Sequence, residues 1–147
     1  MPNVDLVIEN NARAVALKKA MLEVAGDWKG TPYLWGGNSK QGIDCSHFVY
    51  QVINEARTKA AIDGFVPQVV DYRSTSTIEA QNVFIRAAIA QSCDLVMWDG
   101  HVAIVIDPGS GSFIGAQNDG VGESNYITNS YWKNGGVTGF FRFAYLF

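Results

Sequence analysis

Apolar residues in the first part of the chain recur with the spacing of an amphipathic helix. Between residues 11 and 28 they return every three or four positions, which predicts a helix with one buried face. This face consists of Ala14, Leu17, Met21, Val24 and Trp28. A second run, from Cys45 to about Ala60, predicts another helix, with Phe48, Val49, Val52, Ile53 and Ala56 on its buried side. The segment between them, KGTPYLWGGNSKQGID (29–44), is rich in glycine and predicts a loop.

The hydrophobic period changes in the second half of the chain. Residues 63–82 are polar and irregular, and a helical stretch is predicted within 76–91. The runs DLVMW (94–98) and HVAIVID (101–107) flank Asp-Gly, which predicts a β-hairpin with a tight turn. PGSGS predicts the next turn, into a strand FIGAQ (113–117), and GFFRFAYLF predicts a terminal strand.

Helices followed by an antiparallel sheet predict an α+β domain with two segregated layers. No internal repeat or low-complexity linker interrupts the chain, so residues 1–147 are expected to form a single domain. A hydrophobic fraction of 48% over this length is enough for a substantial core.

Charge and termini narrow the possible partners. The net charge is −3 and lysines and arginines do not cluster, which argues against nucleic acid or an anionic membrane surface. No apolar run approaches the ~18 residues of a membrane span. The start, MPNVDLVIENNARAVALKK, lacks the order of a secretory signal. The chain is therefore expected to be made in the cytoplasm and to act there, to be exported by another route, or to belong to a larger protein.

Cysteine and histidine are scarce, which limits the chemistry. Two cysteines cannot form a disulfide framework, and neither belongs to a Cys-x-x-Cys pair. The spacings of the two cysteines and two histidines match no common zinc pattern, so no metal or cofactor is expected.

Cys45 is the first candidate for catalysis. A thiol at a helix N-terminus meets the positive end of the helix dipole, which favours the nucleophilic thiolate. The alternative is that Cys45 packs in the core while Asp44 only caps the helix. His101 is the candidate base, since it begins a strand at the edge of the sheet. An isolated histidine there can equally be structural. His47 is the rival base, but two positions after Cys45 on a helix it should point away from the thiol.

Catalysis by cysteine and histidine also needs a polar group that orients the imidazole. Gln117 can supply it from the strand after His101, with Asn118 adjacent as the other candidate. A structural role at the surface is the alternative for Gln117.

The motifs PYLWGG…GIDCSHFV and DLVMWDGHVAIVI, in this order, resemble the NlpC family of papain-like cell-wall cysteine peptidases. The resemblance covers about residues 31–117. It implies a papain-like fold with N-terminal helices packed on a central antiparallel sheet. It also implies that Cys45 is the nucleophile and His101 the general base.

The same resemblance suggests substrate-binding positions. Tyr33 and Asp44 fall where the family places groups that help to bind a free amine, and Ser46 lies beside the nucleophile. Trp35 and the two glycines after it would shape the loop, and for Trp35 ordinary aromatic packing is the favoured interpretation.

Two positions depart from the family pattern. Where most members carry a second histidine, this chain reads Gly115-Ala116, so the orienting role is expected to move to Gln117. Cys93 replaces the usual glycine before Asp-Leu-Val and is interpreted as a buried, inert thiol.

The implied activity is hydrolysis of an amide bond in peptidoglycan stem peptides, at a D-γ-glutamyl–diamino acid link. Acyl transfer or deamidation by the same residues, and a non-catalytic module that binds cell wall or a partner, are the alternatives. The stretch FIGAQNDGVGESNYITNSYW also resembles domains of bacterial toxins. That suggests an antibacterial effector, delivered by a secretion system to the periplasm or cell wall and inhibited by an immunity protein; a phage lysin is the other route.

Overall fold

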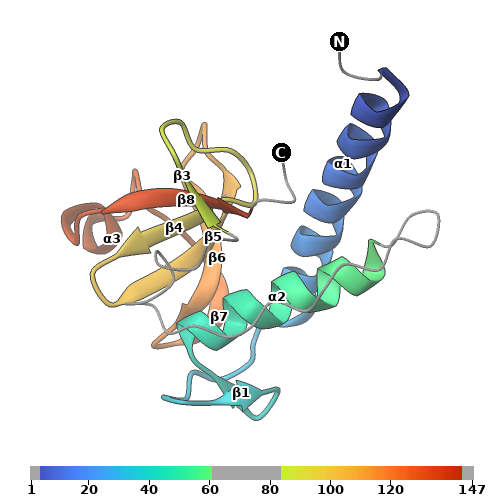
Figure 1. The fold of residues 1–147 in the computed structure, drawn as a ribbon. Coiled ribbons are helices and arrows are strands. Elements are labelled where there is room, and N and C mark those ends of the chain that lie inside the picture. The colour runs from blue at the N-terminus through green and yellow to red at the C-terminus, as the bar shows by residue number, and fades with distance from the viewer. Residues whose placement is uncertain (1–3, 61–83, 144–147) are drawn as a thin grey trace.

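The computed structural model describes residues 4–60 and 84–143 (Figure 1). Within these ranges the chain forms three helices and eight strands. The helices are α1 (Val4–Asp27), α2 (Cys45–Lys59) and α3 (Ser130–Asn134). The strands are β1 (Asn38–Ser39), β2 (Gly42–Ile43), β3 (Phe84–Ala87), β4 (Leu95–Trp98), β5 (His101–Asp107), β6 (Ser112–Gln117), β7 (Gly120–Asn125) and β8 (Gly139–Phe143).

The two long helices form one layer beside the sheet (Figure 1). Both were predicted, although α1 begins at Val4, earlier than the pattern indicated. The predicted apolar faces are buried, and all five residues on the face of α2 are fully inaccessible to solvent. That face packs on β5 and β6, so the helix that begins at Cys45 is fixed against the centre of the sheet.

The main sheet has six strands in the order β3-β8-β4-β5-β6-β7, and every neighbouring pair is antiparallel. The predicted hairpin is confirmed, with Leu95 opposite Ile104 and Trp98 opposite His101. The last strand in the sequence, β8, lies inside the sheet between β3 and β4, and β3 and β7 are the edge strands.

Both faces of the sheet are covered. One face joins α1 and α2 in the larger hydrophobic core. On the other face a smaller cluster forms around Trp98 and Phe113, and Trp132 from α3 packs against it. The sequence therefore predicted the helical layer but not the cover of the second face.

The helix predicted within 76–91 is wrong where the structure can test it. Residues 76–83, like the irregular segment 63–82, lie outside the described residues, but Phe84–Ala87 is a strand that pairs with β8. Phe84 is 6% exposed and belongs to the larger core, whereas its neighbour Ile85 is 48% exposed. Pairing with β8, which lies far along the chain, decides the conformation of this short segment.

Four further short elements of the described residues were not predicted from the sequence. The loop 29–44 contains the two-residue strands β1 and β2, and both β7 and α3 follow the predicted strand β6. In the part of the chain that the structure describes, no helix is long and apolar enough to cross a membrane.

Candidate active site

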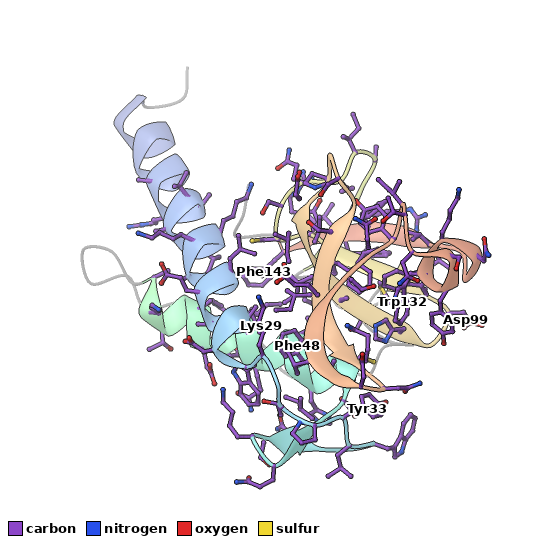
Figure 2. All side chains as sticks on the ribbon, turned by 180° about the vertical axis from the view of Figure 1, so that it is seen from behind. Lys29, Tyr33, Phe48, Asp99, Trp132 and Phe143 are labelled. Carbon is purple, nitrogen blue, oxygen red and sulfur yellow. The ribbon has the colours of Figure 1, made fainter. Side chains whose placement is uncertain are left out.

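A cavity of about 530 Å³ lies where the N-terminus of α2 meets the ends of β4, β5 and β6. Cys45, His101, Gln117 and Tyr33, all predicted from the sequence, line it together, with Asn118 beside Gln117. Figure 2 shows Tyr33, Trp132 and Asp99 on this side of the molecule, while Phe48 belongs to α2 and lies in the core. Residues from a loop, a helix and two strands thus meet at one hollow.

Cys45 is the first residue of α2 and is 7% exposed. Its side chain is part of the larger core and also lines the cavity. The two interpretations from the sequence therefore do not exclude each other, because the thiol packs on one side and meets the cavity on the other. As the first residue of the helix it lies at the positive end of the helix dipole.

Asp44 caps α2 and holds the preceding loop. Its Oδ1 accepts hydrogen bonds from the backbone N–H of His47 at 2.9 Å and from Oγ of Ser46 at 3.3 Å. Its Oδ2 accepts from the backbone N–H of Gly36 at 3.1 Å. Asp44 and Ser46 are both buried, and neither lines the cavity.

His47 also belongs to this capping arrangement. Its Nδ1 lies 2.9 Å from Oδ1 of Asp44, and the residue does not line the cavity. The sequence predicted that His47 would point away from Cys45, and this placement agrees with the prediction.

His101 lies between two tryptophans. Its ring stacks on that of Trp132, with centroids 4.8 Å apart and planes inclined by 28°. The ring of Trp98 lies on another side, at 5.4 Å and 46°. Burial lowers the pKa of His101 from 6.5 to about 4, although the side chain of Gln117 acts in the opposite direction and raises it. The neutral imidazole is therefore the resting form at pH 7.

Gln117 is 8% exposed and lies next to His101. Its Nε2 donates a hydrogen bond to the backbone carbonyl of Gly122 at 3.1 Å. Oε1 of Gln117 and Nε2 of His101 are both buried, and neither has a hydrogen-bond partner of ordinary geometry. The contact between the side chains raises the pKa of His101 but is looser than a regular hydrogen bond. Oε1 of Gln117 can accept a hydrogen bond, and Nε2 of His101 can donate one when it carries the proton of the ring.

Tyr33 lines the cavity from the loop before α2. Burial raises the pKa of its hydroxyl, and the nearby Cys45 and Asp44 raise it further. Trp35 is 86% exposed and is not among the lining residues, so the packing favoured for it from the sequence is wrong. The glycines after it do allow a tight turn, since a Cβ at Gly37 would lie 2.5 Å from the carbonyl oxygen of Gly42.

Eight residues that line the cavity were not predicted as site residues, and five of them have aromatic or acidic side chains. Three are aromatic and two are acidic: Trp98, Tyr131, Trp132, Asp99 and Asp119. Trp98 and Asp99 belong to the predicted hairpin, but their direction toward the site could not be read from it. Tyr131 and Trp132 come from α3, and the only local signal for this helix is Asn129, whose side chain accepts from the N–H groups of both.

Cys93 lies apart from this cavity and is 1% exposed. Burial raises the pKa of its thiol to about 11, and its Sγ donates a hydrogen bond to the carbonyl of Lys18 at 3.4 Å. These properties agree with the inert thiol predicted from the sequence. Among residues 4–60 and 84–143, no group of three or more His, Cys, Asp or Glu side chains is arranged to hold a metal ion.

Known proteins match this chain over most of its length. The model of the NlpC/P60 family matches residues 30–139. The probable peptidoglycan endopeptidase LytE of Bacillus subtilis is 36% identical over 108 residues, which are 71% of this chain and 28% of LytE. The murein DD-endopeptidase MepS/murein LD-carboxypeptidase of Escherichia coli K12 is 29% identical over 130 residues, 85% of this chain and 63% of that protein. The chain therefore spans less than two thirds of either relative.

Solved structures give the same fold. An NLP/P60 family protein of Staphylococcus aureus Mu50, similar to lipoproteins, superposes with a TM-score of 0.64 at 22% identity. It covers 86% of this chain, which corresponds to 41% of that protein. An NlpC/P60 family protein of Bacillus cereus gives a TM-score of 0.62 at 23% identity, with 86% and 40% covered. The predicted α+β, papain-like arrangement is thus confirmed.

Proposed function

The chain belongs to the NlpC/P60 family, and we propose that it is a cysteine peptidase that hydrolyses an amide bond in peptidoglycan stem peptides. The observation that supports this most is the meeting of Cys45, His101 and Gln117 at one cavity, from three separate elements. The names of LytE, a probable peptidoglycan endopeptidase, and of MepS, a murein DD-endopeptidase, point to the same class of substrate.

The proposed reaction begins with a proton transfer from Sγ of Cys45 to the neutral imidazole of His101. The thiolate attacks the scissile carbonyl, and backbone N–H groups at the start of α2 stabilise the oxyanion. His101 then gives its proton to the leaving amine, the C–N bond breaks, and a thioester with Cys45 remains. Water, deprotonated by His101, hydrolyses the thioester and restores the thiol.

Gln117 is proposed as the group that orients the imidazole. Its Oε1 is buried beside His101 and is free to accept an N–H from the ring. An amide oxygen that accepts from one ring nitrogen leaves the other without a proton, ready to accept the proton of the thiol. Asn118 is exposed and lines the same cavity, but the side chain that acts on the pKa of His101 is that of Gln117.

The charge of the cavity favours a substrate with a free amino group. Its lining contains the carboxylates of Asp99 and Asp119 and, in the described part of the chain, neither lysine nor arginine. A D-γ-glutamyl–diamino acid link carries such an amine close to the scissile bond. We propose Tyr33 as a direct substrate contact, with Asp44 and Ser46 supporting it through the cap of α2 and Trp35 at the exposed edge of the loop.

Delivery as an antibacterial effector, with an immunity protein as partner, remains a separate proposal. It is supported by the resemblance of the segment 113–132 to toxin-associated domains. Co-purification of the chain with small proteins from the same source tests it: a stable complex that blocks the cavity is expected, and its absence counts against the proposal.

The function is tested by incubating the protein with isolated peptidoglycan sacculi and identifying released muropeptides by mass spectrometry. Wild type should release fragments whose masses name the cleaved bond, and Cys45→Ala should release none. Cys93→Ala is the matched control, because it removes the other thiol, which is buried away from the cavity.

Each other outcome points to a different function. Products extended by an added acyl acceptor, or a loss of amide nitrogen without cleavage, would identify acyl transfer or deamidation. If sacculi are unchanged by wild type but retain the protein, a binding module replaces the peptidase.

A further inference from the structure

Gly115 lies two residues before Gln117 on the same face of β6, and the place where its side chain would be is occupied by atoms of Gln117 and Ala103. A Cβ built on Gly115 would lie 2.5 Å from Oε1 of Gln117 and 2.8 Å from Cβ of Ala103 on β5. Both distances are far below the ~3.5 Å at which such atoms make favourable contact. The carboxamide of Gln117 therefore folds back over Gly115 and fills the place where a side chain would be.

Pairing between strands explains the direction of this carboxamide. Gly115 lies opposite Gly122 in the register of β6 and β7, and the carbonyl of Gly122 accepts the hydrogen bond from Nε2 of Gln117. Because the amide uses its nitrogen on β7, its oxygen is the end that remains over Gly115. Continuing the register of β5 and β6, in which Ile104 lies opposite Ile114, places His101 opposite Gln117.

Backbone conformation does not explain the glycine. Within the described residues, six glycines have positive φ angles, which other residues rarely adopt, and Gly115 is not among them. What distinguishes Gly115 is the space that it leaves between Ala103 and Gly122 on the neighbouring strands.

We propose that Gly115 is a positioning residue for the reaction. Because Gly115 has no side chain, the carboxamide of Gln117 can lie over it and hold the imidazole of His101 in one tautomer. Nε2 of Gln117 is bound to the carbonyl of Gly122, so Oε1 of Gln117 accepts a hydrogen bond from Nε2–H of His101. Nδ1 of His101 then carries no proton and can take the proton of Cys45. This inference rests on the proposed function, because it assigns Gly115 a part in the same Cys45 and His101 chemistry.

Two substrate-free measurements test the inference. The first is the tautomer of His101, from the ¹⁵N chemical shifts of its ring nitrogens at pH 7. The second is the rate at which iodoacetamide alkylates Cys45, measured in the Cys93→Ala background so that one thiol reacts. Wild type should show the Nε2–H tautomer. Gly115→Ala should show a mixture of tautomers, with alkylation slower by about fivefold, the effect of one lost hydrogen bond.

A double-mutant cycle distinguishes positioning from packing. Gln117→Ala should give the same mixture and the same slower rate, and adding Gly115→Ala to it should change neither further. The swap Ala103→Gly with Gly115→Ala removes the contact with Ala103 but keeps the collision with Oε1. It should therefore behave like Gly115→Ala alone.

Several results would overturn the inference. These are a wild-type tautomer and rate in Gly115→Ala, additive effects in the cycle, or full recovery in the swap variant. If Gly115→Ala does not fold, the swap with Ala103→Gly takes its place, because it removes the 2.8 Å contact and keeps the collision with Oε1 of Gln117. A wild-type tautomer and rate in the swap variant then overturn the inference. Failure of the proposed function looks different, since it would appear as wild-type protein that leaves sacculi intact.

Discussion

Trp132 should help to hold the pKa of His101 low, and replacing it with alanine should raise this pKa. The ring of Trp132 stacks on the imidazole at 4.8 Å and shields it from water. Burial is the cause that lowers this pKa from 6.5 to about 4. That difference corresponds to about 3 kcal/mol against the charged ring.

Two effects of the tryptophan oppose each other, and their magnitudes decide the sign. A stacked indole also stabilises an imidazolium by about 0.5–1 kcal/mol through its π-electrons, and the variant would lose this. Since the total cost of burial is several times larger, opening one face of the ring to water should prevail. We expect the pKa of His101 to rise by roughly one pH unit in Trp132→Ala.

The assay is an NMR titration of the histidine ring protons in the Cys45→Ala background, where no thiol couples to the imidazole. His47 serves as an internal reference, because it contacts Asp44 and does not line the cavity. Tyr131→Ala is the matched control: it removes the neighbouring aromatic residue, which packs on Trp132, whereas the rings that contact His101 are those of Trp98 and Trp132. An unchanged or lower pKa of His101 in Trp132→Ala would refute burial as the dominant cause.

Two further predictions concern stability, measured by urea unfolding. Asp44→Ala removes the cap of α2 and the bond to Gly36, so the free energy of unfolding should fall by about 2 kcal/mol; a change below about 0.5 kcal/mol would show that the cap contributes little. Arg142→Ala removes the charged partner of Asp94, a fully buried carboxylate bound by two guanidinium nitrogens at 2.9 and 2.8 Å, and leaves it the hydrogen bond from the backbone N–H of Gln91. This should cost about 3 kcal/mol, with Arg142→Lys intermediate, and equal stability of all three proteins would contradict it.

The elements that could be predicted are those whose signals are local. The helical spacing of α1 and α2 and the Asp-Gly turn between β4 and β5 are contained in short stretches of sequence. The same holds for Cys45 and His101, which lie at the starts of two of these elements. Their meeting at one cavity required the family resemblance in addition, because no local pattern fixes how a helix sits on a sheet.

The elements that could not be predicted take their conformation from distant partners. Strand β3 lies in the segment 76–91, where a helical stretch was expected, because a short apolar run suits either a helix or a strand. Its pairing with β8 determines that it is a strand. Strand β7, with the sequence GVGESN, has little intrinsic preference for a strand and forms by pairing along the whole of β6. Helix α3 has only five residues, too few for a hydrophobic period.

These weakly encoded elements are the ones that assemble the site. On β7, Val121 exchanges backbone hydrogen bonds with Gly30 and Thr31, at 3.0 and 2.9 Å, and so ties the loop before α2 to the end of the sheet. The carbonyl of Gly122 on the same strand holds Gln117. Helix α3 in turn is fixed by the bond from Nε1 of Trp98 to the carbonyl of Trp132, and it covers His101. The apolar core thus determines the two layers that carry Cys45 and His101. The contacts of β7 and α3 then position the loop before α2, Gln117 and the ring of His101 around the cavity. It follows that removing a contact that β7 or α3 makes with the site should impair the site more than it reduces stability, whereas substitutions in the core should impair the site and reduce stability together.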